Sequence, residues 1–130
     1  MNYLTKRVLI TTNQFVVSLS KDPFSILNEG NLDYLVSAIQ YKYGDKAEEE
    51  QLVLKAAFML DFIANKAHMF AEGNKRTAVS STLLFLALNE AALVEIDEGE
   101  LLNFVLLVAG GSQSISSVAK WLKQRIKILK

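Results

Sequence analysis

The side chains best suited to chemistry lie together in the segment HMFAEGNKRT, residues 68–77. Lys75 and Arg76 follow Gly73 at the predicted start of a helix, where two cations would face the positive end of the helix dipole. That placement becomes favourable if an anion binds there, because free backbone N–H groups and both cations can then hold a phosphate. Gly73 suits this role, since glycine permits a close approach of the backbone and a positive φ.

The same segment contains the other groups that transfer from a nucleotide requires. Glu72 would be repelled by phosphate alone, but it becomes a natural ligand if Mg²⁺ lies between them. His68 is the single histidine of the chain and could accept a proton from an incoming hydroxyl. Phe70 is expected to anchor the segment on the core. Each feature alone has an ordinary structural explanation, such as a helix cap for His68, but the combination favours a functional motif.

The elements that must position this segment are predicted to be helices, because one proline and six glycines supply too few turns for a β-rich fold. Apolar residues recur at helical spacing from about Glu48 to about Lys66. A second helix is expected from about Asn74 to Asn89, and its apolar run 83–88 predicts a central helix buried on most sides. A further apolar helix contains Leu101–Val108. We therefore expect an all-α protein.

The composition limits the other possibilities. The 130 residues, 51% of them hydrophobic, fit a single domain, residues 1–130, with a substantial core. Fourteen basic residues balance fourteen acidic ones, which argues against general nucleic-acid binding. The absence of cysteine excludes disulfides, thiolate metal sites and cysteine nucleophiles. No apolar stretch approaches the roughly 20 residues of a spanning helix, and no signal peptide is recognisable, so a cytoplasmic protein is expected.

The last predicted helix is basic. Ser114–Ser117 offers N-cap candidates, and an apolar stripe continues from Val118 to Ile126. One interpretation of its cations is a patch for nucleic acid or an acidic partner. The other, which we favour, is a solvated face near the negative end of the helix dipole. The residues concerned are Lys120, Lys123, Arg125, Lys127 and Lys130.

From His68 to Arg76 the sequence reads H-x-F-x-E-G-N-K-R, which resembles the signature of the Fic/Doc superfamily. The form with a lysine is similar to the Doc (death-on-curing) branch. The segment Ile26–Leu32 is similar to the flap that precedes the second helix of the family. The resemblance covers nearly the whole chain and includes the segments 53–66, 77–89 and 118–122.

The resemblance implies an all-helical bundle with a central buried helix and a small flap over a nucleotide site, with ATP and Mg²⁺ as ligands. His68 would be the general base and Glu72 the magnesium ligand. The flap would contain Ile26, Leu27, Asn28, Glu29 and Gly30. The phosphates would be held by the turn of Gly73 and Asn74 and by the side chains of Lys75 and Arg76.

For activity, the Doc branch implies a toxin that transfers the γ-phosphate of ATP to a hydroxyl side chain of a target protein, a translation elongation factor, and that a small antitoxin partner suppresses. One alternative is transfer of AMP, as in Fic relatives, which have a glycine at the place of Lys75 and an arginine at the place of Val79. The cation of Lys75 favours the kinase. A second alternative is a catalytically silent interaction protein.

The flap departs from the family pattern. Relatives often have Arg-Asp where this chain has Leu27 and Asn28, which leaves the contacts of the flap open and supports the silent alternative. The segment Ser25–Gly30 also fits the S/T-x-x-x-E-G/N pattern of a self-inhibitory glutamate, which would be Glu29. We interpret that match as a coincidence, because it falls within the flap-like segment.

Overall fold

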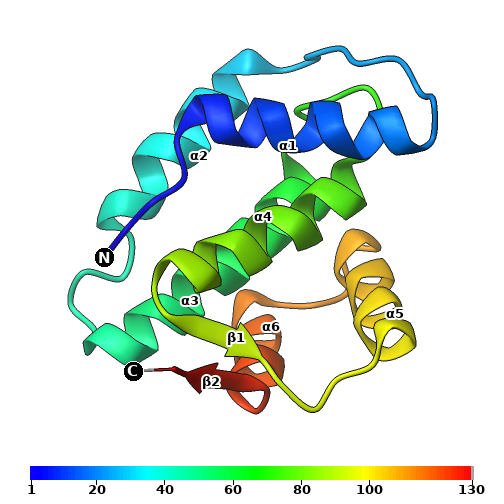
Figure 1. Ribbon diagram of the computed structural model, residues 1–130. Coiled ribbons are helices and arrows are strands. Elements are labelled where there is room, and N and C mark those ends of the chain that lie inside the picture. The colour runs from blue at the N-terminus through cyan, green and yellow to red at the C-terminus, as the bar shows by residue number, and fades with distance from the viewer. Residues whose placement is uncertain (130) are drawn as a thin grey trace.

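The computed structural model describes residues 1–129, and helices form almost all of its regular structure (Figure 1). This confirms the predicted all-α class. No helix among these residues is long and apolar enough to cross a membrane. The elements in chain order are α1 (Lys6–Leu19), α2 (Glu29–Tyr41), α3 (Glu48–Asp61), the π-helical turn η1 (Phe62–Lys66), α4 (Asn74–Leu88), β1 (Ala91–Leu93), α5 (Glu98–Ala109), α6 (Ile115–Lys123) and β2 (Ile126–Ile128).

Most helices begin at a side chain that caps them. Thr5, Asn28, Asp97 and Ser114 each accept a hydrogen bond from the backbone N–H three residues further on, at the starts of α1, α2, α5 and α6. These bonds satisfy one of the free N–H groups of each first turn. Ser114 is one of the predicted N-caps. In contrast, α4 begins after Gly73, which has no side chain to offer.

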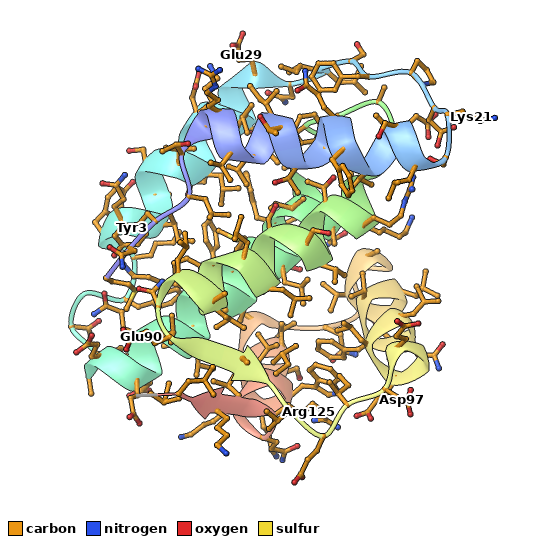
Figure 2. All side chains as sticks on the ribbon, in the orientation of Figure 1. Tyr3, Lys21, Glu29, Glu90, Asp97 and Arg125 are labelled. Atoms are coloured by element: carbon orange, nitrogen blue, oxygen red, sulfur yellow. The ribbon has the colours of Figure 1, made fainter. Side chains whose placement is uncertain are left out.

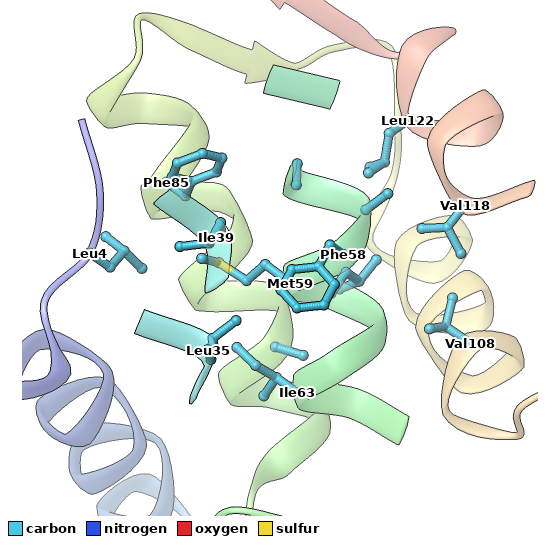
Figure 3. Packing of buried hydrophobic residues seen from close by; sticks show 14 of the residues in the cluster. Leu4, Leu35, Ile39, Phe58, Met59, Ile63, Phe85, Val108, Val118 and Leu122 are labelled. Atoms are coloured by element: carbon cyan, nitrogen blue, oxygen red, sulfur yellow. The ribbon is translucent and has the colours of Figure 1, made fainter. Parts of the chain in front are cut away.

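The core is built around α3, in which all residues from Val53 to Asp61 except Leu54 are buried. The helix α4 lies in the middle of the bundle, in contact with α1, α3 and α5 (Figure 1). Figure 3 shows how side chains from α2, α3, α4 and α5 meet in one cluster, with α6 closing the far side. The labelled members include Leu35, Ile39, Phe58, Met59, Ile63, Phe85, Val108, Val118 and Leu122.

The predicted burial of the run 83–88 on most sides is wrong. Phe85 and Leu86 are fully buried, but Leu83, Leu84 and Leu88 are 38%, 38% and 41% exposed. A helix of this length buries only the faces that neighbours cover, and one face of α4 remains open to solvent. The more thoroughly buried helix is α3.

The end of the chain also departs from the prediction. The helix expected to reach Ile126 ends at Lys123, and β2 pairs antiparallel with β1, with Leu93 opposite Ile126 and Ala91 opposite Ile128. Alternate residues of a strand point to the same face, so the two isoleucines can pack together against the core. Their β-branched side chains also suit a strand.

Candidate active site

The residues that were predicted to take part in chemistry lie on the loop between η1 and α4 and at the start of α4. His68 follows the π-helical turn and has a φ of 45°, and Gly73 ends the loop with a φ of 77°. A positive φ is uncommon at a residue other than glycine and often marks a functional position. The loop borders a cavity of about 290 Å³. Its lining residues are His68, Ala71, Glu72, Gly73, Asn74 and Lys75 on one side and Ile63, Ala64, Asn65 and Ala109 on the other.

Position 73 requires a glycine both because its backbone is left-handed and because atoms of α1 leave no room for a side chain. A Cβ atom at this position would lie 3.1 Å from Cγ1 of Val17 and 3.2 Å from Cγ1 of Val16, both on α1. The turn therefore packs directly on α1. Within residues 1–129 no side chain caps α4, so the first N–H groups of this 15-residue helix are left for a ligand or water.

Asn74 closes the loop on itself. Its Nδ2 donates to the carbonyl of Phe70 at 2.8 Å, and its Oδ1 accepts from the N–H of Phe70 at 3.2 Å. Phe70 is 1% exposed and packs against Phe24, with ring centroids 6.2 Å apart. The side chain of Asn74 thus shapes the loop, while its backbone N–H belongs to the open helix start.

Two charged groups face the cavity without a protein partner. Glu72 and Lys75 are exposed, and within residues 1–129 neither forms an ion pair. His68 is exposed at the same cavity. The structure therefore brings one imidazole, one carboxylate, one ammonium and an open helix start to a single depression, which is the combination that the sequence predicted.

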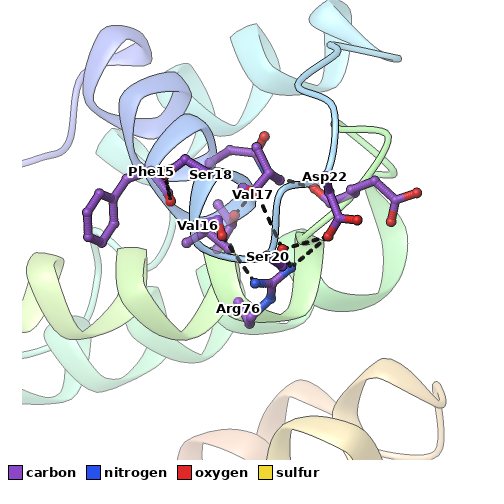
Figure 4. Close-up of polar contacts among 10 residues, drawn as sticks. Phe15, Val16, Val17, Ser18, Ser20, Asp22 and Arg76 are labelled. Atoms are coloured by element: carbon purple, nitrogen blue, oxygen red, sulfur yellow. Dashed lines mark hydrogen bonds and ion pairs between the residues drawn. The ribbon is translucent and has the colours of Figure 1, made fainter.

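The structure places Arg76 away from this cavity. Its guanidinium donates to the carbonyl of Val16 and to Oγ of Ser20, each at 3.1 Å, and lies 3.6 Å from Oδ2 of Asp22 (Figure 4). The physical reason is the end of α1, whose last carbonyls have no partner within the helix and carry its negative dipole. The guanidinium would have to leave these acceptors to make the predicted phosphate contact.

The predicted flap divides between two elements. Ile26 pairs with Phe70 in an antiparallel bridge, and the N–H groups of Leu27 and Asn28 both donate to the carbonyl of Met69, at 2.8 and 3.2 Å. Because Asn28 caps α2, Glu29 and Gly30 belong to the first turn of that helix and not to a flap. None of the five lines the cavity. The strand-like part braces the loop between η1 and α4 from outside.

Glu29 lies at the outer edge of the molecule, where Figure 2 labels it. Its Oε1 is 2.7 Å from Nζ of Lys6, and Oδ1 of Asp33 is 2.8 Å from the same nitrogen. Hydrogen bonds to Asp33 and then to Glu29 raise the pKa of Lys6 above its ordinary value. The carboxylate of Glu29 is thus engaged on α1 and does not enter the cavity.

Sequence reasoning missed two asparagines that hold the loop. Asn13 of α1 donates to the carbonyl of Glu72 at 2.8 Å, and Asn31 of α2 donates to the carbonyl of Ala67 at 2.8 Å. A signal existed for the first: Asn13 shares a helical face with Leu9 and Val16, where a polar residue needs a buried partner. Asn31 gave no comparable signal.

A sequence model of the Fic/DOC family matches residues 5–86, which include α1, the loop and most of α4. The chain belongs to the Fic/DOC family. It is also similar to the protein kinase doc of Escherichia phage P1, with 25% identity over 124 residues, 95% of each chain. The Fic/DOC match contains every residue that lines the cavity except Ala109, so the cavity is built almost entirely from the family region.

Proposed function

We propose that this Fic/DOC protein is an ATP-dependent protein kinase toxin of the Doc type, which transfers the γ-phosphate of ATP to a hydroxyl side chain of a target protein, a translation elongation factor. The observation that carries the proposal is the open start of α4 beside Lys75, Glu72 and His68 at one cavity. The similarity to a relative named as a protein kinase over nearly its whole length supports this reaction.

Each residue of the site has a separate role in the proposed reaction. The N–H groups at the start of α4 and the ammonium of Lys75 bind phosphate oxygens and stabilise the charge that they carry. His68 accepts the proton of the target hydroxyl as its oxygen forms a bond to the γ-phosphorus. The bond between that phosphorus and the β–γ bridging oxygen breaks, so that the products are a phosphoprotein and ADP.

Magnesium fits this site as a companion of the nucleotide. Within residues 1–129 no three His, Cys, Asp or Glu side chains gather into a metal site. Mg²⁺ in nucleotide enzymes commonly takes one or two carboxylates together with phosphate oxygens and water. Glu72, exposed at the cavity and adjacent to the phosphate-binding turn, would hold the ion. When bound, the ion would neutralise phosphate charge and orient the oxygens.

The position of Lys75 favours phosphoryl transfer over AMP transfer. Lys75 lines the cavity, and position 79, where AMP-transferring relatives have an arginine, is occupied by Val79, which is half-buried against the core and offers no guanidinium. The ammonium of Lys75 adds a positive charge to the phosphate-binding turn and so changes which phosphate of ATP the turn can hold. For this reason we propose that the γ-phosphate, and not the α-phosphate, binds beside the start of α4.

We further propose a small antitoxin protein as the partner and the cytoplasm as the location. Exposed apolar side chains of α1, α4 and α5 border a groove of about 470 Å³ that also reaches Lys75 and Arg76. A contiguous apolar surface beside a charged site is suited to an inhibitor chain. The apolar lining includes Phe15, Leu19, Leu83, Leu101 and Leu102.

A labelling experiment tests the reaction. Purified protein is incubated with a cell lysate and ATP labelled at the γ- or the α-phosphate, and His68→Ala is the control. Label transferred from the γ-position alone, and absent with His68→Ala, supports the kinase. Label from the α-position would establish AMP transfer instead, and no transfer from either position would favour the silent interaction protein. Growth arrest on expression, lost in folded His68→Ala, tests the toxin.

A further inference from the structure

One buried amide joins α1 to the loop at both sides of Gly73. Asn13 is fully buried, and its Nδ2 donates to the carbonyl of Glu72 at 2.8 Å and to Oγ1 of Thr77 at 3.0 Å. Glu72 precedes the left-handed residue, whereas Thr77 lies in the first turn of α4. A single side chain therefore fixes the end of the loop relative to the start of the helix.

A fully buried amide on an apolar helix face points to a role beyond packing. Oδ1 of Asn13 is buried and has no hydrogen-bond partner within residues 1–129. An apolar residue of similar volume would suit a helix face that Asn13 shares with Leu9, Val16 and Val17. Within residues 1–129 only the donor half of the amide has partners, and these lie on either side of the turn at Gly73.

We propose that Asn13 is a positioning residue that orients the carboxylate of Glu72 toward the phosphate-binding turn. By holding the carbonyl of Glu72, it fixes the backbone from which that side chain projects into the cavity. By holding Thr77, it sets the direction of the open N–H groups of α4. This inference rests on the proposed function, because the carboxylate matters there as the ligand of the nucleotide-bound Mg²⁺.

The substitution Asn13→Leu tests the proposal, since leucine keeps the branched heavy-atom skeleton of the side chain and removes both N–H donors. In the wild-type protein the N–H of Thr77 donates to the carbonyl of Gly73 at 2.8 Å. We expect the variant, without any ligand, to exchange this amide hydrogen faster than the wild type does. We also expect the Mg²⁺ concentration that half-saturates ATP binding to rise about 10- to 100-fold, as for other residues that hold a metal ligand in place. The melting temperature should stay within a few degrees.

The matched control is Gln14→Leu, the same chemical change on the exposed neighbour in α1, which should leave both readouts unchanged. If Asn13→Leu does not fold, Asn13→Ala takes its place, because alanine removes both N–H donors without adding bulk or charge to the buried site. A folded variant with wild-type exchange and wild-type Mg²⁺ dependence overturns the proposal. Failure of the wild-type protein to transfer phosphate would refute the proposed function, while hydrogen exchange would still decide whether Asn13 holds the turn.

Discussion

The carboxamide of Asn74 bonds to both backbone polar groups of Phe70, donating to its carbonyl at 2.8 Å and accepting from its N–H at 3.2 Å. The two hydrogen bonds span the three residues that separate the buried anchor of the loop from the first residue of α4. Because Phe70 is buried, this pair fixes the turn containing Glu72 and Gly73 on the core. The side chain that a motif would assign to ligand binding is used to give the loop its shape.

Asn74→Ala should therefore destabilise the protein through the loop. It leaves the N–H and carbonyl of Phe70 without partners, which we expect to lower the free energy of unfolding by about 1–3 kcal/mol. Urea denaturation measures the effect. Asn103→Ala on the exposed side of α5 is the control and should be neutral or slightly stabilising, because alanine is the better helix former. Equal stability of Asn74→Ala and wild type would show that the two bonds contribute nothing.

Gly73→Ala should damage both stability and nucleotide binding. Alanine at a φ of 77° costs about 1–2 kcal/mol, and its Cβ would press on Val16 and Val17 of α1 at 3.1–3.2 Å. The start of α4 must shift to relieve these contacts, so the affinity for ATP should fall. Gly30→Ala is the control, since a Cβ there would meet only Oδ1 of Asn28 at an ordinary 3.5 Å. The measurements are thermal unfolding and calorimetric titration with ATP.

The contrast between Lys75 and Arg76 shows what a sequence motif can and cannot specify. Five residues of the motif line one cavity, because a contiguous loop before a helix allows little freedom in where they lie. The direction in which the Arg76 side chain points depends on α1, because the carbonyl of Val16 accepts a hydrogen bond from its guanidinium. Since α1 lies more than fifty residues earlier in the sequence, local patterns do not reveal this acceptor. The same limit explains why the role of Asn13 was not predicted, because its partners are brought to it only by the packing of α1 against the turn.

Leu83 and Ile126 illustrate a second limit of prediction from sequence, which is that periodicity does not show which neighbours a residue will meet. An apolar run predicts a helix, but which faces are covered is decided by the neighbours, and Leu83 remains 38% exposed beside the groove of α1 and α5. Ile126 fits the helical stripe of α6 by spacing, yet pairing with Leu93 draws it into a strand. Periodicity reports a local preference, and long-range pairing overrides it.

Arg76→Ala and Lys75→Ala should consequently have different effects. Loss of Lys75 removes a cation from the cavity and should raise the KM for ATP about 10-fold or more, as expected for a charged hydrogen bond to phosphate. Loss of Arg76 removes its bonds to Val16 and Ser20 and should mainly lower thermal stability. Its pairing with Asp22 adds little, because both side chains are largely exposed. A KM increase in Arg76→Ala as large as that of Lys75→Ala would show that the guanidinium reaches the nucleotide.

Glu29→Gly tests whether this chain inhibits itself. A self-inhibitory glutamate must reach the phosphate-binding turn, but Glu29 is held on α1 by Lys6 at 2.7 Å and does not line the cavity. We therefore expect the transfer rate of Glu29→Gly to equal that of the wild type in the γ-phosphate assay. Lys6→Met, which releases the carboxylate without removing it, is the matched control and should also leave the rate unchanged. A markedly more active Glu29→Gly variant would mean that this carboxylate leaves Lys6 and occupies the site in solution.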